Sequence, residues 1–309
     1  MDKEEQQSDA RHWVVGKVGA GERLDRFLVR QLPGSTRGQV SRLLEVGSAR
    51  VNGRRGRKGW ILCAGDRVSL RAAVSWDAAP DSSVVLSIVY EDEHFVVVDK
   101  PAGIPCHPLT PGEIGTVASG LVARYPEMAG VGHHPREPGL LHRLDNDTSG
   151  LLLAARHQEA FERLWAALQR EEVDKRYRAL VVGAQLPKGR QRAFLEALGA
   201  RVRVRSGPSA RAVEICTELL GHLAVGDHCL ADVRVHRAKR HQIRAHMAFM
   251  GHALYGDVTY GGPRAYDGGG HALHASVLGL RHPITGHALR WLSPLPGPFR
   301  RRIELVGRP

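Results

Sequence analysis

The stretch His142-Arg-Leu-Asp-Asn-Asp-Thr-Ser-Gly150 places a histidine, an arginine and two acids ahead of a turn of small residues. In an extended segment, Asp145 and Asp147 would point to the same face. The end of the stretch favours a turn instead, because Asp and Ser side chains bond to nearby backbone and Gly accepts unusual dihedral angles. In a turn the two carboxylates diverge, so a shared two-carboxylate site is not expected here.

Three alternatives remain for the chemistry of this stretch. Asp145 and Asp147 alone are too few ligands for a divalent metal, which takes further oxygen or nitrogen donors, so no metal is predicted. A glycosidase-like pair needs a defined separation between two acids, which a sequence does not show. A single carboxylate, Asp145, beside the cationic Arg143 would stay ionised even when partly buried. The same two residues are equally consistent with a salt bridge that only stabilises the fold.

The composition indicates a globular protein with a polyanionic partner. The 309 residues are 42% hydrophobic, enough for a core, and carry a formal net charge of +12. Such an excess favours nucleic acid or an acidic membrane surface, with a generally basic surface as the simpler alternative. No apolar run reaches the roughly 20 residues that cross a bilayer. The four cysteines contain no CxxC pair and suit a reducing cytosol, so we expect a cytoplasmic protein without a membrane anchor.

The segments around the stretch alternate between strand-like and helix-like patterns. LLLAAR (151–156) predicts a buried strand, and HQEAFERLWAALQREE (157–172) predicts an amphipathic helix. Further elements are predicted as strands at 95–100, 175–183 and 228–237, and as helices at 116–125 and 241–251. Residues 185–225 are Arg-rich and show no clear period, so we expect irregular structure there.

The order of these patterns divides the chain into four parts. Residues 1–20 form a polar tail, residues 21–73 a compact basic unit, and residues 84–309 a larger unit. The linker at 74–83 has the Pro, Asp and Ser of a domain junction.

The basic unit combines two helices and a hairpin. RLDRFLVRQLP (23–33) predicts the first helix, Ser35 or Thr36 caps the second, and Asn52-Gly53 marks a tight hairpin turn. The residues expected to contact RNA are Arg23, Arg37, Arg42, Arg50, Arg54, Arg55, Arg57 and Lys58. A set of one sign across two helices and a hairpin repels itself unless a partner offsets it.

This unit resembles the small alpha-L RNA-binding domain of a ribosomal small-subunit protein and of several RNA-modifying enzymes. The resemblance rests on RLDRFL (23–28), STRGQVSRLLEVGSARVNG (35–53) and AGDRV (64–68). It implies a domain that grips structured RNA through shape and phosphates.

The larger unit resembles the RluA-type pseudouridine synthases, beginning with HRLDNDTSG itself. The similarity extends to the strand and loop at 91–108, the Lys175-x-Tyr177 element, the helix and glycine-rich turn at 241–262, and the block at 273–286. The motifs occur in family order. The resemblance implies an α+β fold with a mixed, mainly antiparallel central sheet flanked by helices.

The implied reaction is the isomerisation of uridine in RNA to pseudouridine, without metal or cofactor. By motif, Asp145 is the catalytic carboxylate, which attacks the anomeric carbon of the ribose or abstracts a proton from the sugar. Tyr177 stacks on the uracil, Arg244 pairs with Asp145 and keeps it ionised, and Leu273 packs against the flipped base.

The resemblance implies further substrate contacts, from His142, Arg143, Thr148, Lys175, Lys239, His241 and Gln242. Of these, Arg143 and Thr148 shape the Asp145 loop, and His142 is expected to be a structural hydrogen-bond partner. One departure concerns substrate choice. The Thr-Gly-Arg that usually precedes the 241–262 block is replaced, with Ala238 for the glycine and Lys239 for the arginine, which loses bidentate geometry.

The expected partner is structured RNA, with large-subunit ribosomal RNA favoured over tRNA, and the expected oligomeric state is a monomer. Two rival hypotheses stand beside it. A non-catalytic RNA-binding or ribosome-assembly factor on the same scaffold would not need Asp145, Tyr177 and Arg244 together. A metal-dependent nuclease using Asp145 and Asp147 would lose activity with EDTA.

Overall fold

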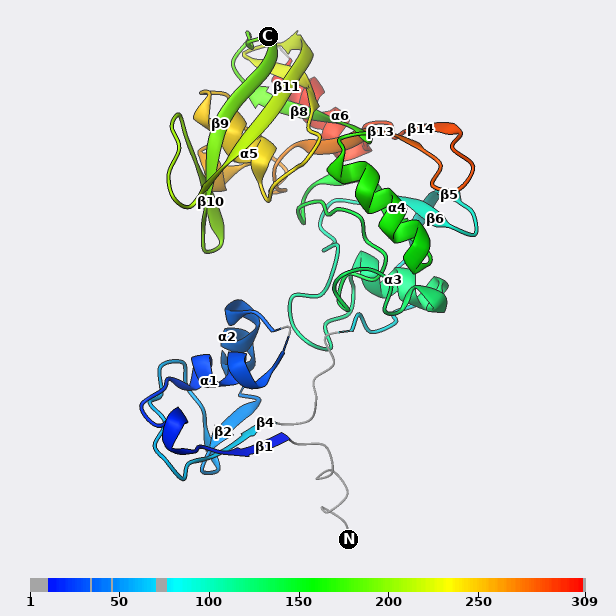
Figure 1. Ribbon diagram of the computed structural model, residues 1–309. Coiled ribbons are helices and arrows are strands. Elements are labelled where there is room, and N and C mark those ends of the chain that lie inside the picture. The colour runs from blue at the N-terminus through cyan, green and yellow to red at the C-terminus, as the bar shows by residue number, and fades with distance from the viewer. Residues whose placement is uncertain (1–10, 34, 46, 71–76, 308–309) are drawn as a thin grey trace. The chain divides into compact units, whose positions relative to one another are not determined.

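The computed structural model describes residues 11–33, 35–45, 47–70 and 77–307, and these divide into two compact units (Figure 1). The first comprises the described part of Met1–Asp77 together with Pro108–Glu113. The second comprises Ala78–His107 and the described part of Ile114–Pro309. Each unit is considered separately below.

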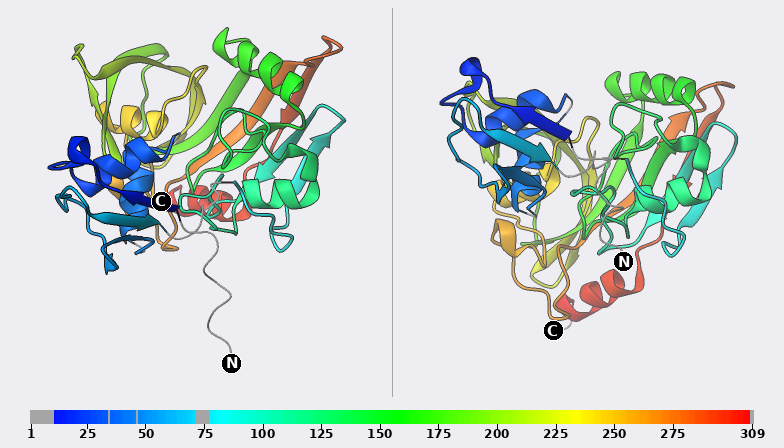
Figure 2. Two further views of the ribbon diagram at one scale, coloured as in Figure 1. Left: turned by 60° about the horizontal axis from the view of Figure 1, so that its bottom comes forward. Right: turned by 90° about the horizontal axis from the view of Figure 1, so that it is seen from below.

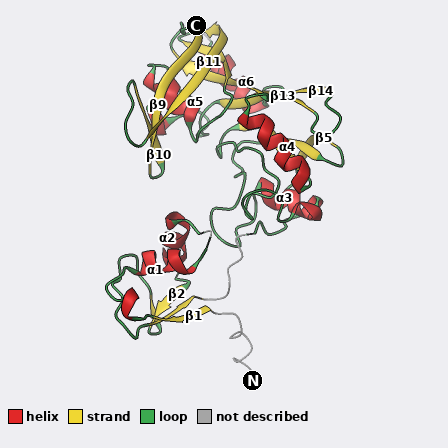
Figure 3. Ribbon diagram, in the orientation of Figure 1, coloured by secondary structure: helices red, strands yellow, loops and turns green. Residues whose placement is uncertain are grey.

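The N-terminal unit packs two helices against a small sheet, as the colouring in Figure 3 shows. The helices are α1 (Leu24–Gln31) and α2 (Arg37–Glu45). Four strands pair in the order β1-β4-β2-β3, namely β1 (Arg11–Val14), β2 (Ala49–Val51), β3 (Arg54–Arg55) and β4 (Arg67–Leu70). Leu24, Phe27 and Leu28 of α1 are buried in its core, as their helical spacing predicts.

The predicted caps and turns of this unit are confirmed. Thr36 accepts a hydrogen bond from the Gln39 N–H (3.3 Å), and the Gln39 side chain accepts one from the Thr36 N–H (2.6 Å). This reciprocal capping box starts α2. Asn52 and Gly53 both take positive φ angles, 49° and 77°, between β2 and β3. Two positive φ angles in succession are the signature of a type I′ hairpin turn.

The predicted tail and linker are both too long. Strand β1 lies within the predicted tail and pairs antiparallel with β4, and Val15 beyond it is buried in the core. RHWV has no strong alternation, so pairing with β4 decides the structure there. Residues 1–10 lie outside the described residues. In the linker, Ala78 is buried and its N–H bonds to the Pro135 carbonyl (3.3 Å), so the second unit starts before residue 84.

A large sheet forms the second unit, and its extent can be followed in Figure 2. Within the described residues, ten strands pair in the order β10-β9-β11-β12-β8-β13-β7-β6-β5, with β14 added on β13. The strands are β5 (Ser87–Glu91), β6 (Phe95–Lys100), β7 (Ser149–Ala155), β8 (Asp174–Val182), β9 (Gly189–Leu198), β10 (Arg201–Arg205), β11 (Ala212–Val225), β12 (His228–Arg234), β13 (Leu273–Arg281) and β14 (Ala288–Leu292). Only the β7–β13 pairing is parallel among those described. The predicted mixed, mainly antiparallel sheet is confirmed.

Helices cover both faces of this sheet. One buried cluster joins β6, β7 and β8 to α3 (Val117–Arg124) and α5 (Gln242–Phe249). The alternate residues of these strands, whose side chains point to the other face, pack on α4 (Gln158–Gln169) and α6 (Gly297–Val306). Because side chains alternate along a strand, α3 and α5 lie on one face and α4 and α6 on the other. Short 3₁₀ turns complete the structure at Lys17–Gly19, Pro126–Met128 and Val258–Tyr260.

Residues 185–225 are not irregular as predicted, because they supply β9, β10 and all of β11. RVRVR of β10 alternates exposed and buried positions, with arginine at each exposed site. A strand with one solvated face lacks a continuous apolar run, and the arginines hide its period of two.

Gly150 explains the end of the opening stretch. Its φ is 108°, and a Cβ there would lie 2.2 Å from the carbonyl oxygen of Ala275 on β13. Only glycine permits this approach of the two parallel strands. The Asp145 turn is therefore fixed at the start of a strand in the middle of the sheet.

Candidate active site

Hydrogen bonds from backbone and from a buried lysine fix the turn that carries Asp145. The Thr148 N–H bonds to the Asp145 carbonyl (3.0 Å), which closes the turn before β7. Lys100 is fully buried, and its Nζ donates to the carbonyls of Pro101 (2.9 Å), Ile104 (2.7 Å) and Asn146 (2.8 Å). The lysine thus ties the turn to the loop after β6 and fixes the backbone next to Asp145.

The side chain of Asp145 faces a buried arginine. Nη1 of Arg244, on α5, donates to Asp145 Oδ2 at 2.9 Å. The remaining edge of the same guanidinium forms a bidentate pair with Asp257, with Nε at 2.7 Å and Nη2 at 2.9 Å. Asp257 is 2% exposed. A bidentate carboxylate fixes the plane of the guanidinium, so Arg244 presents one defined N–H to Asp145.

Two aromatic rings complete the support of Arg244. The guanidinium lies over the ring of Tyr260, 5.2 Å from its centre. The Tyr260 hydroxyl and Nδ1 of His241 are 2.9 Å apart, and the hydroxyl accepts a bond from the Val202 N–H at 3.1 Å. His241 begins α5 with a positive φ of 54°, and its Nε2 lies 3.9 Å from Asp145 Oδ1. Residues from β10, α5 and the turn after it therefore converge on one carboxylate.

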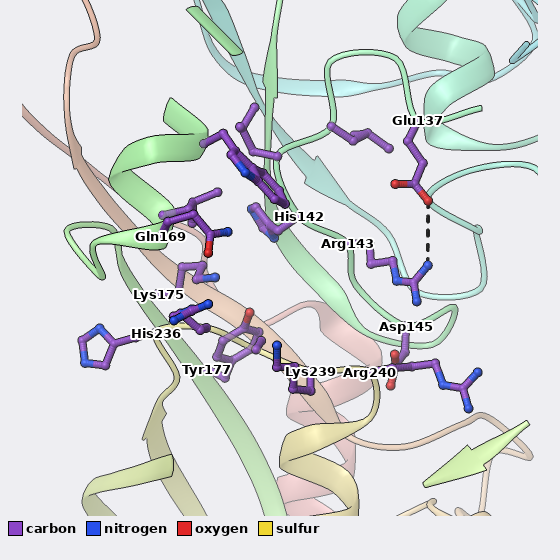
Figure 4. Close-up of a pocket in the computed structure, with 16 residues that line it drawn as sticks. Glu137, His142, Arg143, Asp145, Gln169, Lys175, Tyr177, His236, Lys239 and Arg240 are labelled. Carbon is purple, nitrogen blue, oxygen red and sulfur yellow. Dashed lines mark ion pairs between the residues drawn. The ribbon is translucent and has the colours of Figure 1, made fainter. Parts of the chain in front are cut away.

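The structure brings together the four residues expected to act on the target uridine. A small cavity of about 40 Å³ is lined by Asp145, Tyr177, Arg244 and Leu273. A larger cavity of about 380 Å³ shares Asp145 and Tyr177 and continues toward α4. Figure 4 shows the residues that line this larger cavity, with Tyr177 between Lys175 and Asp145.

The ionisation of this site follows from burial and pairing. Burial by itself lowers the pKa of the Arg244 guanidinium, but the hydrogen bonds to Asp257 and Asp145 outweigh it and raise the pKa. Burial raises the pKa of Tyr177, and the charge on Asp145 adds to the increase. Near neutral pH the site therefore holds a permanent cation and a neutral phenol beside Asp145.

The other predicted contact residues divide into two groups. Arg143 lies on the wall of both cavities, with Nη1 3.2 Å from Nε2 of His107 and 3.8 Å from Glu137. Lys239 is exposed at the rim. Thr148 and Gln242 also line the small cavity, yet their side chains are already engaged. The Thr148 hydroxyl bonds to His271 (2.8 Å), and Gln242 bonds to the Lys239 N–H and the Cys216 carbonyl.

The two carboxylates of the opening stretch do not share a site. Asp145 faces Arg244, whereas Asp147 lies against the backbone of Gly270, where a Cβ would come within 2.0 Å of Asp147 Oδ2. In the described part of the chain, no group of three or more His, Cys, Asp or Glu side chains is arranged to hold a metal ion. No helix in the same residues is long and apolar enough to span a membrane.

Comparison with known proteins identifies the family. A model of the RNA pseudouridylate synthase family matches residues 94–249, and a model of the S4 domain matches residues 22–68. The chain is 34% identical over 302 residues to an uncharacterized RNA pseudouridine synthase of Synechocystis, covering 94% of this chain and 90% of that protein. The chain belongs to the RNA pseudouridylate synthase family. The predicted reaction class, an isomerase acting on RNA, is confirmed, as is the N-terminal RNA-binding domain.

Relatives with named substrates are similar over nearly their full length. Ribosomal large subunit pseudouridine synthase D of Pseudomonas aeruginosa is 34% identical, with 93% of this chain and 92% of that protein covered. The protein of that name from Escherichia coli K12 is 32% identical, with 95% and 93% covered. Human RNA pseudouridylate synthase domain containing 4 shares the fold, with a TM-score of 0.56 at 22% identity, covering 71% of this chain and 92% of that one.

Sequence reasoning missed several residues of this pseudouridylate synthase site. Asp257 and Tyr260 lie in GDVTYGG, which was taken only as a turn. Lys100 is the last residue of β6, and the sequence pattern placed it only in the strand at 95–100, without a partner. The available signal was chemical. A charged residue in an apolar or glycine-rich segment, such as Lys100 or Asp257, requires a partner when it is buried.

The basic residues of the S4-like unit lie mostly on its surface. Arg23, Arg37, Arg50, Arg54, Arg55, Arg57 and Lys58 are exposed, while the side chain of Arg42 lies outside the described structure. Three of them are partly engaged, and one of these, Arg55, donates to the Glu45 carbonyl. Arg23 pairs with Asp25 (2.9 Å), and Arg50 donates to the Gly53 carbonyl (2.9 Å).

Proposed function

We propose that this chain converts a uridine of large-subunit ribosomal RNA to pseudouridine, with Asp145 as the catalytic carboxylate. The observation that carries the proposal is the Asp145–Arg244–Asp257 chain of ion pairs, which faces a cavity also lined by Tyr177 and Leu273. The named function of the relatives from P. aeruginosa and E. coli supports ribosomal RNA as the substrate.

The site suits a reaction on an extruded nucleotide. A base within a duplex must leave the stack before its glycosidic bond is reached. Stacking on an aromatic ring contributes about 1–3 kcal/mol per base, and Tyr177 supplies such a ring. Leu273, buried on β13, offers an apolar surface in the same cavity. Together they would hold the uracil while its sugar carbon lies at Asp145.

The bond changes place two demands on Asp145. The bond between uracil N1 and ribose C1′ breaks, a bond from C5 to C1′ forms, the C5 proton passes to solvent and N1 takes up a proton. Asp145 acts either as a nucleophile at C1′ or as a base toward the sugar, and both roles need an ionised carboxylate. Arg244 donates a hydrogen bond to this carboxylate and so orients it toward the cavity.

Tritium release tests this function directly. Large-subunit ribosomal RNA transcribed with tritium at uridine C5 should release tritium to water on incubation with the chain. Asp145→Asn should abolish release, because its amide is neither a nucleophile nor a base, while RNA binding persists. Absence of release from both ribosomal RNA and tRNA with the unmodified chain would reject the proposal. Release from tRNA alone would reject the substrate but keep the reaction.

We also propose a monomer acting in the cytoplasm. The described ion pairs around Asp145 come from a single chain, so the site needs no second copy to be complete. Light scattering during gel filtration should give a mass near the 33.9 kDa of one chain. A dimer mass would reject this part of the proposal.

A further inference from the structure

The larger cavity has an end that the proposed reaction does not use. Its volume of about 380 Å³ is in the range of ligand-binding pockets. In Figure 4, His142, Gln169, Lys175 and His236 lie on one side of Tyr177, and Asp145 and Arg240 lie on the other. The space beyond Tyr177 is therefore separate from the atoms expected to react.

Lys175 brings an uncompensated positive charge to this end. It is 5% exposed on β8, and it forms no ion pair with any carboxylate of the described residues. Burial lowers its pKa to about 8, so most molecules still carry the charge at pH 7. Burying a charge without a partner is costly. The fold alone gives no reason for this cost.

His142 adds a neutral donor beside the lysine. Its Nε2 accepts a hydrogen bond from the Leu153 N–H (3.2 Å). Burial, with a contribution from the charge on Lys175, lowers its pKa to about 3, so the ring is neutral. The single ring proton must then be on Nδ1, because Nε2 is accepting. Nδ1 is buried and has no partner among the described residues, and the same is true of Nδ1 of His236.

The carboxylates on the cavity wall are already engaged elsewhere. Glu137 lies 3.2 Å from Nε2 of His107 and 3.6 Å from Arg136, and Asp145 is held by Arg244. The far end thus presents the Lys175 cation, the Nδ1–H of His142 and an unpartnered ring nitrogen of His236, which together suit an anion with several acceptor oxygens.

We propose that Lys175, with His142 and His236, binds a backbone phosphate of the RNA next to the target uridine. The inference rests on the proposed function and adds a specific contact to it. A phosphate would pair the buried charge of Lys175 and accept from the imidazole Nδ1–H of His142. This contact would fix where the strand passes Tyr177 when the uridine enters the small cavity, because phosphate contacts set register on nucleic acid.

Lys175→Met tests the charge, with Lys175→Arg as the charge-preserving variant. Tritium release should show a KM increased on the order of tenfold to a hundredfold for Lys175→Met, as expected for a lost charged hydrogen bond. The slope of log KM against log salt should fall by about 0.7–0.9, the value of one phosphate contact. Lys188→Met removes an exposed charge from the same unit and should change neither quantity appreciably.

Thermal stability separates a binding role from a structural one. Because Lys175 pairs with no carboxylate of the residues that the structure describes, Lys175→Met should hold or raise the melting temperature. A fall in melting temperature, together with an unchanged salt slope, would show that Lys175 serves the fold and would overturn the proposal. Should Lys175→Met not fold, His236→Leu, nearer the surface, provides the same KM measurement.

Synthetic RNA with single modified phosphates identifies which phosphate Lys175 contacts. Individual phosphates around the target uridine are replaced by uncharged methylphosphonates, one at a time. One position should weaken binding to the unmodified chain but not to Lys175→Met, giving a non-additive pair. Additive losses at every position would overturn the phosphate site, and a KM change without any salt effect would indicate a base carbonyl instead. Failure of the unmodified chain to release tritium from unmodified RNA would count against the proposed function, not against this contact.

Discussion

The two units use arginine in opposite ways. In the N-terminal unit the basic side chains of the β2–β3 hairpin, such as Arg54 and Arg57, are exposed to solvent. In the larger unit Arg244 is 7% exposed and bonds to two carboxylates and a tyrosine ring. Exposed charges gain little from protein neighbours, whereas a buried charge is costly unless partners compensate it, as Asp145 and Asp257 do for Arg244.

This difference separates affinity from chemistry. Exposed cations contribute to RNA binding roughly additively, and salt screens them. The buried network cannot lose a member without leaving another charge unpaired. Removing charges from the first unit should therefore cost binding, and removing Arg244 from the buried network should cost folding and catalysis together.

The largest expected effect comes from Arg244→Met. It leaves Asp145 and Asp257 without their cation, and breaking such a buried pair costs about 3–5 kcal/mol in the free energy of unfolding. Tritium release should also be lost, because Arg244 no longer orients the Asp145 carboxylate. Urea unfolding measures the free energy of unfolding, and the tritium-release assay on the same preparation measures the activity.

A matched arginine in the same unit serves as the control. Arg302 on α6 is also 7% exposed, pairs with Asp267 through two bonds (3.0 and 2.8 Å) and donates to the Gly270 carbonyl (2.6 Å). Arg302→Met should lose a similar amount of stability yet keep kcat. Equal loss of kcat in both variants would mean that Arg244 matters only for folding.

A smaller effect is expected in the pH dependence of stability at Lys175. Its folded pKa of about 8 lies below the unfolded value of about 10.4, so between these pH values the unfolded chain binds more protons. The free energy of unfolding of the unmodified chain should therefore rise with pH across that window, relative to Lys175→Met. The advantage of Lys175→Met, on the order of 3 kcal/mol, should be full below pH 8 and fade above it.

Lys100 does not disturb this comparison. Burial lowers its pKa to about 8 as well, but it is present in both proteins and its effect cancels. Parallel stability curves for the two proteins from pH 6 to 10 would refute the assignment of the lowered pKa to Lys175.

The exposed charges of the first unit should give a still smaller, salt-dependent effect. The triple variant Arg54→Gln, Arg57→Gln and Lys58→Gln should weaken RNA binding about tenfold at moderate salt and lower the salt slope by about 2–3. Saturating RNA should restore kcat. A control triple of exposed residues in the larger unit, Lys188→Gln, Arg300→Gln and Arg301→Gln, should leave the slope nearly unchanged. A lower kcat at saturation in the hairpin triple would contradict the division between affinity and chemistry.

The elements predicted correctly are those with a strong local period. The α4 pattern and the buried run of β7 were visible because each repeats one kind of residue at a regular spacing. Strands β9 and β10 were missed because alternating arginines mask a solvated strand, and β1 because it is defined by its pairing with β4. Local sequence carries no record of a partner strand far along the chain.

The same limit applies to the site. Motif resemblance placed Asp145, Tyr177, Arg244 and Leu273, and the structure brings all four to one cavity. It did not reveal that Asp257 holds the opposite edge of Arg244. Two residues 13 apart on a helix and a glycine-rich turn meet only because the turn folds back on the helix. Geometry of that kind depends on tertiary packing.

The smallest effect is expected at Asp147, the second acid of the opening stretch, and it sharpens the contrast with Asp145. Asp147 lies against the Gly270 backbone, and its Oδ1 is 3.5 Å from the Asn146 side-chain amide. No arginine of the described residues forms an ion pair with it. Asparagine has the same shape and can keep those contacts. Asp147→Asn should therefore lower kcat/KM for tritium release by less than about fivefold, within 1 kcal/mol. A loss comparable with that of Asp145→Asn would show that both carboxylates act in the reaction, since only a chemical role distinguishes an acid from its amide at this position.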